Sequence, residues 1–151
     1  DEELWVKGSS VMQGYYNMPK ETEETLEDGW LKTGDLGYVD EDGFIFLTGR
    51  KKNLIITPNG ENVSPEEIEN KLAENRLVQE VLVRESEGVI EAEIFPDYEY
   101  AGKKKIKDIQ SELQKIIDAY NQGAPLYKRV FKIKVRETEF EKNTTKKIKR
   151  F

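Results

Sequence analysis

The sequence of 151 residues contains no cysteine and no histidine. These absences exclude a disulfide scaffold, a cysteine nucleophile, a Ser-His-Asp triad and a zinc site built from the usual Cys and His ligands. A metal ion could be bound only by oxygen atoms, which favours Mg²⁺ or Ca²⁺. No pair of carboxylates marks a specific acid–base site, and we predict no metal-binding residues in the chain.

Long apolar runs are also missing, and none approaches the roughly 20 residues that a membrane-spanning helix needs. The sequence begins with Asp1-Glu2-Glu3 and so has no basic region typical of a signal peptide. We therefore expect a cytoplasmic protein. Hydrophobic residues make up only 36% of the chain, but 2 Trp, 7 Tyr and 6 Phe argue against disorder. The length suffices for one domain or two small ones.

Charge is unevenly distributed along the chain, whose net charge is −6. Residues 1–49 carry 12 acids and 3 bases, whereas residues 50–151 carry 18 acids and 21 bases. The sign changes at Arg50-Lys51-Lys52. This asymmetry indicates two structural units with different surroundings, although chance clustering on solvated faces would give the same pattern.

The first of these parts is predicted to be rich in β-structure. Residues 4–7 form a short strand candidate, and residues 20–26 are expected to form one or two helical turns. Residues 36–39 and 44–48 are β-rich runs on either side of an acidic turn that contains Gly43. This arrangement predicts a hairpin.

The second part is predicted to alternate strands and helices. A β-branched run at 54–57 leads through a loop to a helix at 65–74. Ser64 and Glu67 have the spacing of a capping box around that helix start, and Pro65 occupies its first position. The elements expected further along are a hairpin of residues 80–84 and 89–95, a helix over 105–122, and a strand over 129–135.

Four local clusters could carry chemistry, and three of them lie in the first 62 residues. Thr33-Gly34-Asp35 places a carboxylate that could accept hydrogen bonds from a ribose diol, or simply from turn N–H groups. Arg50-Lys51-Lys52 could bind phosphates, or could form a solvated basic turn. The loop at 58–62 contains Gly60, which would let a ligand approach the backbone closely, or would merely connect a strand to a helix.

The fourth cluster is the basic segment at the C-terminal end. Residues 142–151 include five bases and no acid. A mobile basic tail could bind nucleic acid or an anionic membrane surface, or could deliver one lysine to a negatively charged transition state. A frayed, solvated chain end is the alternative. Overall acidity and the lack of interleaved aromatic residues weigh against nucleic acid.

Taken in order, these clusters resemble the C-terminal part of the adenylate-forming enzymes, which include acyl-CoA synthetases, peptide-synthetase adenylation domains and luciferases. The sequences at 50–57 and 62–65 are most similar to those of the long-chain acyl-CoA synthetases. The segments that carry the resemblance are Gly14-Tyr15-Tyr16-Asn17, Pro19, Thr22, Gly29-Trp30, Thr33-Gly34-Asp35, Gly49-Arg50, Gly60, Val63, Pro65, Glu67-Ile68-Glu69, Pro125, Tyr127 and Lys147-Ile148-Lys149-Arg150.

The resemblance implies an α+β fold in two parts. Residues 1–49 would be the β-rich end of a large N-terminal domain that binds ATP and the acyl substrate. Residues 50–151 would be the small mobile C-terminal lid, a mixed sheet with helices. The chain would then be an inactive piece of a longer enzyme, the parent protein, that joins a long-chain fatty acid to CoA through an acyl-adenylate.

The resemblance also implies roles for single residues. Asp35 is similar to the acid that holds the ribose hydroxyls of ATP, and Arg50 to the arginine near the ribose and phosphates. Lys52 occupies the hinge position between the two parts. Gly60 resembles the loop that approaches the pantetheine arm of CoA. Lys147 matches the lysine that assists adenylation, and Mg²⁺ would arrive with ATP.

Three features depart from the family pattern. The stretch from Arg50 to Gly60 is one residue longer than in luciferase-like members. Lys146 stands where the family usually has glycine, and the hinge residue is Lys52 where many members have aspartate. Three other readings remain open at this point. The parent could load a carrier protein instead of CoA, the chain could be a non-catalytic anion-binding module, or it could be a stand-alone lid that acts with a separate chain. Peripheral membrane contact of the parent also remains open.

Overall fold

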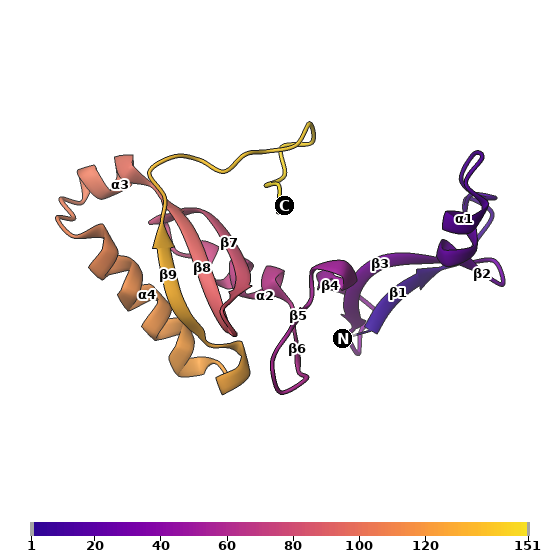
Figure 1. The fold of residues 1–151 in the computed structure, drawn as a ribbon, viewed down its shortest axis with the longest axis horizontal. Coiled ribbons are helices and arrows are strands. Elements are labelled where there is room, and N and C mark those ends of the chain that lie inside the picture. Colours follow the sequence, from indigo (N-terminus) through magenta and orange to yellow (C-terminus); the bar gives the residue numbers. More distant parts are fainter. Residues whose placement is uncertain (1, 151) are drawn as a thin grey trace. The chain divides into compact units, whose positions relative to one another are not determined.

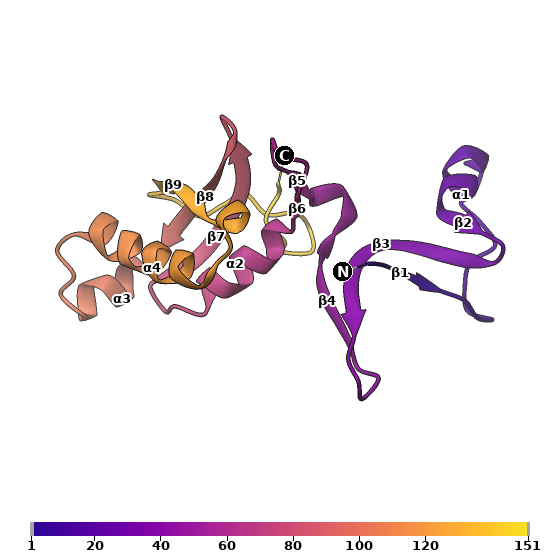
Figure 2. The same cartoon turned by 90° about the horizontal axis from the view of Figure 1, so that it is seen from below.

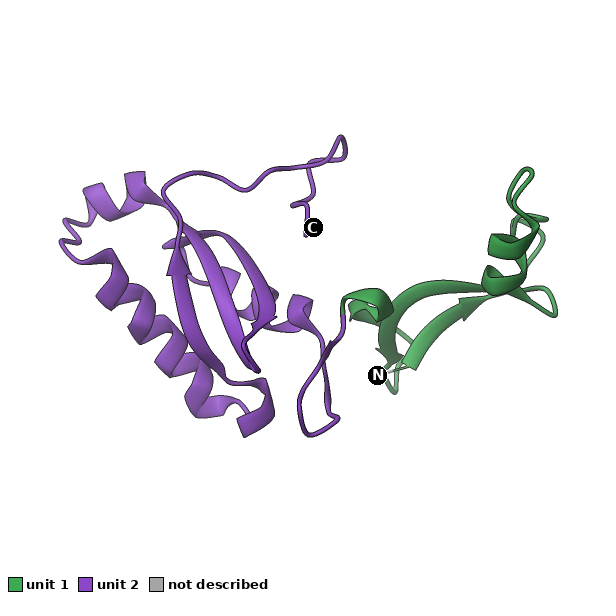
Figure 3. Ribbon diagram, in the orientation of Figure 1, with its two compact units in different colours: residues 1–53 green, residues 54–151 purple. Residues whose placement is uncertain are grey.

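The computed structural model of the protein describes residues 2–150. The chain forms two compact units, Asp1–Asn53 and Leu54–Phe151 (Figure 3). The division into compact units falls after Asn53, and the predicted domain boundary after residue 49 stays a prediction. Arg50 and Lys51 belong with the first unit because they pair there with Asp35 and Glu3, at 2.8 and 2.9 Å.

The first unit is built around an antiparallel sheet (Figure 1). Strand β3 is central, and β1, β2 and β4 all pair with it. The predicted hairpin is present as β3 and β4, with a tight turn in which the Asp40 carboxylate accepts the N–H groups of Asp42 and Phe44. The elements of this unit are β1 (Glu2–Val6), α1 (Pro19–Thr25), β2 (Leu26–Glu27), β3 (Trp30–Val39), β4 (Ile45–Arg50) and the short 3₁₀ helix η1 (Lys51–Asn53).

This unit has almost no core of its own. Among the described residues up to Asn53, Leu36 is the only buried large hydrophobic side chain. Large apolar side chains of the β3–β4 hairpin are exposed instead, namely Tyr38, Val39, Phe44, Ile45, Phe46 and Leu47. Because successive side chains of a strand point to opposite faces, these residues make both faces of the hairpin apolar, and exposed apolar surface of this extent is typical of a part that the rest of a protein covers.

The second unit contains a mixed three-stranded sheet, in which β8 pairs antiparallel with β7 and parallel with β9. The predicted α+β class is confirmed. The elements are β5 (Ile55–Ile56), β6 (Asn62–Val63), α2 (Pro65–Ala73), β7 (Val78–Ser86), β8 (Val89–Pro96), α3 (Tyr98–Lys103), α4 (Ile109–Gly123), η2 (Leu126–Lys128) and β9 (Val130–Val135). Figure 2 shows α2 and α4 from a second direction.

The hydrophobic core of this unit lies where the helices α2 and α4 meet one face of the sheet. Successive side chains of a strand point to opposite faces, so every second residue of β7 and β8 enters the core. The fully buried members include Ile68 and Leu72 from α2, Leu113 and Ile117 from α4, and Ala92 and Ile94 from β8. This packing fixes the frame from which the loops of the unit project.

Two details of the helices differ from the sequence prediction. Ser64 occupies the N-cap position of α2, but its side chain caps no helix N–H; its hydroxyl lies 3.2 Å from a Glu66 carboxylate oxygen. The long helix begins at Ile109 and not at residue 105, because Lys105 adopts a positive φ of 55° and Asp108 is the N-cap. The short helix α3 was not predicted.

The second face of the sheet carries a charge network around Glu93, whose carboxylate is almost fully buried. Arg136, Lys134 and Arg84 surround it at 2.7, 3.3 and 3.4 Å. Burial alone would raise the pKa of Glu93, but the hydrogen bonds from Arg136 and Lys134 outweigh it and hold that pKa below the usual value of 4.5.

The Glu93 network predicts acid sensitivity. Because its folded-state pKa is lowered, Glu93 stabilises the fold above its unfolded-state pKa, and this contribution is lost as the pH falls through the folded-state value. We expect Glu93→Gln to lower the free energy of unfolding at pH 7 by about 3 kcal/mol, since three cations lose their buried partner. Urea unfolding from pH 7 to pH 3 measures this, and a difference that stays constant over the range would contradict it.

Candidate functional site

The β3–β4 pairing brings two of the predicted site residues together. Asp35 lies opposite Arg50 in the register of the two strands. The Nε atom of Arg50 is 2.8 Å from Oδ1 of Asp35, and the carboxylate side chain is 28% exposed. One carboxylate oxygen thus holds the guanidinium, and the exposed part of the carboxylate can accept hydrogen bonds from a ligand.

The residues before Asp35 fix its backbone. The Thr33 hydroxyl donates to the Leu4 carbonyl at 2.7 Å and accepts the N–H of Asp35 at 3.1 Å. Gly34 has a φ of +73°, which glycine adopts without strain, and its N–H donates to Glu3. The Thr-Gly-Asp sequence therefore forms a rigid irregularity that sets the direction of the Asp35 side chain.

Lys52 lies in η1, the last element of the first unit. It is exposed and stands two residues before the second unit begins at Leu54. A hinge residue is expected at such an element boundary, where a few backbone angles can absorb a rotation. Its role as a hinge remains a prediction.

Gly60 lies in the tight turn between β5 and β6. Its N–H donates to the Thr57 carbonyl at 2.8 Å, and its φ of +80° requires glycine or a strained residue. The Thr57 hydroxyl also accepts the N–H of Glu61 at 3.1 Å. No atom lies within 4 Å of where a Cβ of Gly60 would stand, so the backbone angle and not crowding explains the glycine.

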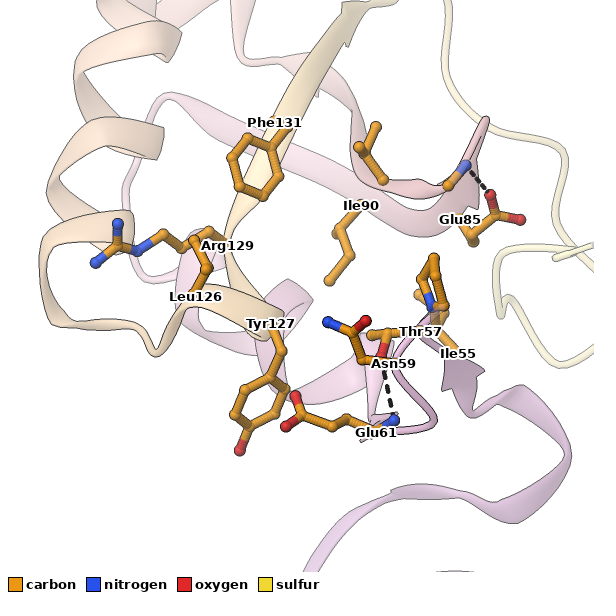
Figure 4. A pocket seen from close by; sticks show the side chains of 13 residues that line it. Ile55, Thr57, Asn59, Glu61, Glu85, Ile90, Leu126, Tyr127, Arg129 and Phe131 are labelled. Atoms are coloured by element: carbon orange, nitrogen blue, oxygen red, sulfur yellow. Dashed lines mark hydrogen bonds between the residues drawn. The ribbon is translucent and has the colours of Figure 1, made fainter.

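A cavity of about 330 Å³ opens beside this turn (Figure 4). Thr57, Asn59 and Glu61 line one side, and the segment from Leu126 to Phe131 lines the other. Tyr127 presents an aromatic side chain that is 37% exposed. The Arg129 guanidinium is directed toward the end of α4, where its Nε donates to the Ala124 carbonyl. The Gly60 turn is thus one wall of a hollow with apolar and polar sides.

Lys147 lies in a closed turn and not in a loose tail. The Asn143 side-chain oxygen accepts the N–H of Lys147 at 2.9 Å, and the Asn143 N–H donates to the Lys147 carbonyl at 2.9 Å. Lys142 and Ile148 form an isolated β-bridge just outside the turn. In the described residues 142–150 these hydrogen bonds close the backbone into a turn, and whether the segment is mobile stays a prediction.

The ammonium group of Lys147 is exposed, and within residues 2–150 no carboxylate pairs with it. Lys146 is exposed and unpaired in the same way, whereas the other bases of residues 142–150 are paired. Lys142 pairs with Glu80, Lys149 with Glu141 at 3.0 Å, and Arg150 with Glu69. The turn thus presents two adjacent unpaired cations, Lys146 and Lys147, and the Asn143 side chain binds the backbone N–H of Lys147.

Lys146 adopts the left-handed backbone conformation that favours glycine, the residue usual at this position of the family pattern. Its φ is +61°, in the left-handed region that side chains with a Cβ enter at a cost of roughly 1–2 kcal/mol. Its N–H donates to the Asn143 carbonyl at 2.9 Å. The turn type explains why glycine would be favoured here.

Lys146→Gly should relieve this backbone strain, but glycine also increases the conformational entropy of the unfolded chain, which offsets part of the gain. We expect a net increase of about 0.5–1 kcal/mol in the free energy of unfolding. Thermal or urea unfolding of the two chains measures the difference. Lys115→Gly, at an exposed position inside α4, is the matched comparison and should destabilise by about 1 kcal/mol. A Lys146→Gly variant that loses as much stability as Lys115→Gly would contradict the assignment of strain.

No group of three or more Asp, Glu, His or Cys side chains within residues 2–150 could hold a metal ion. Nor does any helix in that range combine the length and apolar character needed to cross a bilayer.

Comparison with known proteins identifies the family. Residues 52–150 match the family described as the AMP-binding enzyme C-terminal domain. The chain therefore belongs to this family, and the predicted resemblance to adenylate-forming CoA ligases is confirmed at that level.

The relatives are CoA ligases of more than one kind. A long-chain-fatty-acid–CoA ligase of Bacillus subtilis is 51% identical over 81 residues, which cover 54% of this chain and 14% of the relative. A 2-succinylbenzoate–CoA ligase of Listeria monocytogenes is 48% identical over 83 residues, 55% of this chain and 18% of the relative. The matched part of the chain is thus less than a fifth of each relative's length.

Solved structures of CoA synthetases are also similar to this chain. An o-succinylbenzoate CoA synthetase of Bacillus subtilis, in complex with its acyl-adenylate intermediate, matches 97% of this chain and 28% of its own, with a TM-score of 0.79 and 32% identity. A fatty acyl CoA synthetase of Mycobacterium tuberculosis matches 97% of this chain and 28% of its own, with a TM-score of 0.57 and 29% identity. The subtype within the CoA ligases therefore stays open.

Sequence reasoning missed Asn143, which organises the turn around Lys147. Asn and Asp side chains often bond to backbone N–H groups two residues further on, and Asn143 binds Thr145 in this way at 3.0 Å. The Asn-Thr-Thr sequence was therefore a readable turn signal that lay inside an otherwise basic segment.

Proposed function

We propose that this chain is the C-terminal part of an AMP-forming acid–thiol ligase, and that it acts only within a longer parent protein. The observation that carries the proposal is the terminal turn. It holds the backbone of Lys147 in place and leaves its ammonium available, whereas Lys142, Lys149 and Arg150 are paired; Lys146 is also available and is separated from Lys147 by the variants described below. A preorganised cation of this kind suits a reaction that develops negative charge at one point.

The reaction would proceed in two steps. In the first, a carboxylate oxygen of the substrate bonds to the α-phosphorus of ATP and pyrophosphate leaves. In the second, the thiol of CoA attacks the acyl carbonyl, and AMP and a proton are released. Mg²⁺ bound to ATP supplies charge neutralisation at the phosphates.

Different residues of this chain would contact the nucleotide, the reacting groups and CoA. Asp35 would accept hydrogen bonds from the ribose hydroxyls, and Arg50, already held by Asp35, would lie close to the nucleotide. Lys147 would stabilise the charge between the carboxylate and the α-phosphate without transferring a proton. The pantetheine arm of CoA would pass the Gly60 turn, and the cavity beside it offers room for part of the thiol substrate.

The first unit supports the idea of a longer parent. Its hairpin exposes large apolar side chains, and Leu36 is the only large hydrophobic side chain buried in its described part, so it lacks the core that would let it fold as a domain alone. A large upstream part that binds ATP and the acyl group would cover these side chains. The 151-residue chain by itself is then expected to be inactive.

We further propose a long-chain fatty acid as the substrate. The long-chain-fatty-acid ligase of Bacillus subtilis and the sequence around 50–57 favour this choice, whereas the 2-succinylbenzoate ligases define the competing substrate. The test is to incubate the parent protein with ATP, Mg²⁺ and CoA, offering each acid in turn, and to identify the thioester by mass spectrometry.

The product that forms distinguishes the proposed function from its alternatives. Long-chain acyl-CoA supports the full proposal, and succinylbenzoyl-CoA replaces the substrate but keeps the reaction. Adenylate that forms without transfer to CoA favours the carrier-loading reading. No adenylate from any acid would overturn the proposal and favour a non-catalytic anion-binding module.

A further inference from the structure

The turn that contains Lys147 is organised by a single side chain. Oδ1 of Asn143 accepts three hydrogen bonds, from the Thr145 N–H at 3.0 Å, the Thr145 hydroxyl at 2.8 Å and the Lys147 N–H at 2.9 Å. The Asn143 backbone adds two more, to Lys146 and Lys147. Because these bonds converge on one residue, the geometry of the turn depends on Asn143.

The segment that leads into the turn is tied to strand β7. Phe140 is buried, and its N–H donates to the Glu80 carboxylate at 2.9 Å. The same carboxylate pairs with Lys142, which also binds Glu139 at 2.9 Å. These contacts, led by the hydrogen bond from Lys142 to Glu80, raise the pKa of Lys142. The entry to the turn is thus held against the sheet.

The segment that leaves the turn is tied to helix α2. Arg150 binds both oxygens of the Glu69 carboxylate, one of them at 2.9 Å, and lies 3.5 Å from Glu66. Glu69 also accepts the Val83 N–H at 2.7 Å, so its position is fixed by α2 and β7 together. Burial raises the pKa of Glu69 above the usual value of 4.5 against the pull of Arg150.

We propose that Asn143 is a positioning residue for Lys147. This inference rests on the proposed function. Two anchors, Glu80–Lys142 and Glu69–Arg150, fix the ends of the turn to the body of the second unit, and Asn143 fixes the backbone between them. Lys147 therefore enters and leaves a reaction site through movement of the whole unit and not through bending of a loose tail.

The first test uses the 151-residue chain and needs no activity. Amide hydrogen exchange of Lys147 and Thr145, measured by NMR, reports the two N–H groups that Asn143 binds. Asn143→Ala should accelerate exchange at both amides and leave the amides of β7 and β8 unchanged. Asn143→Asp keeps the accepting oxygen and should retain the protection. Unchanged exchange in Asn143→Ala would overturn the proposal.

The second test uses the parent protein and separates the two half-reactions. Asn143→Ala should lower carboxylate-dependent ATP–pyrophosphate exchange by roughly 10- to 100-fold, because a misplacement of about 1 Å can cost that much. Thioester formation from preformed acyl-adenylate and CoA should be unaffected. Asn143→Asp should restore most of the exchange, and Thr144→Ala, in the same turn but without a role in its hydrogen bonds, should leave it unchanged.

Lys147→Ala is measured in parallel so that the two proposals can fail separately. If Lys147→Ala abolishes exchange and Asn143→Ala does not, Asn143 has no positioning role and the proposed function stands. If Lys147→Ala leaves exchange intact, the role of Lys147 in the proposed function is wrong, and a positioning role for Asn143 falls with it. Loss of both half-reactions in Asn143→Ala would indicate general damage to the fold and would also contradict the proposal.

Discussion

Replacing Lys147 by alanine in the parent protein is expected to lower carboxylate-dependent ATP–pyrophosphate exchange by about 10²- to 10³-fold, the effect of removing one preorganised charge from a transition state. The turn around Asn143 fixes the backbone of Lys147, and no described carboxylate neutralises its ammonium. Thioester formation from preformed adenylate should survive, because the thiol attacks the acyl carbonyl after the phosphate charge has developed.

Lys146→Ala provides the matched control, since it removes the adjacent lysine from the same turn. Its positive φ directs the side chain of Lys146 differently from that of Lys147, so exchange should change by less than about fivefold, the size of a single exposed charge effect. The opposite result, in which Lys146→Ala loses exchange and Lys147→Ala keeps it, would show that the family register assigns the wrong lysine.

Asp35→Ala is expected to raise the KM for ATP in the adenylation step by about 100-fold. Two hydrogen bonds from ribose hydroxyls to a carboxylate are worth roughly 1.5 kcal/mol each or more, and alanine removes both. The same change releases Arg50, which loses its 2.8 Å partner. Initial rates at varied ATP concentration, with the carboxylic acid saturating, give the KM and the kcat separately.

Stability measurements distinguish a binding role of Asp35 from a structural one. The Asp35–Arg50 pair is partly exposed, at 28% and 49% of the two side chains, and pairs of this kind contribute only about 0–1 kcal/mol. Asp42→Ala, in the exposed turn of the same hairpin, should leave the KM for ATP unchanged. If Asp35→Ala unfolds the protein or leaves the KM unchanged, the assignment of Asp35 to the ribose is wrong.

The sequence predicts the regular elements best where a periodic pattern and a turn signal coincide. Both hairpins and helix α2 are present close to their predicted positions because alternating apolar residues and Gly-containing turns define them locally. The start of α4 is harder to predict from the sequence. Ile106 fits the helical spacing of the apolar residues, which predicts an earlier start. The Asp108 side chain accepts the N–H of Ser111, however, and so caps a helix that begins at Ile109.

Long-range interactions explain what the sequence could not predict. The basic composition of residues 142–151 indicates a solvated tail, but in the described residues 142–150 Lys142 and Arg150 bind acids far along the chain, Glu80 and Glu69. No local pattern reports the partners of Arg150 and Lys142. The Ser64 side chain, by contrast, binds a local partner, Glu66, in place of a helix N–H. The Asp35–Arg50 pair was different, because a hairpin between them made their proximity foreseeable.

The most direct measurement of the central claim is carboxylate-dependent exchange of labelled pyrophosphate into ATP by the parent protein, with the 151-residue chain assayed beside it. We predict exchange by the parent that requires both a carboxylic acid and Mg²⁺, and none by the chain alone. Exchange by the chain alone would contradict the claim that it is one part of a ligase. A folded parent that shows no exchange with any carboxylic acid would contradict the claim that the ligase forms an acyl-adenylate.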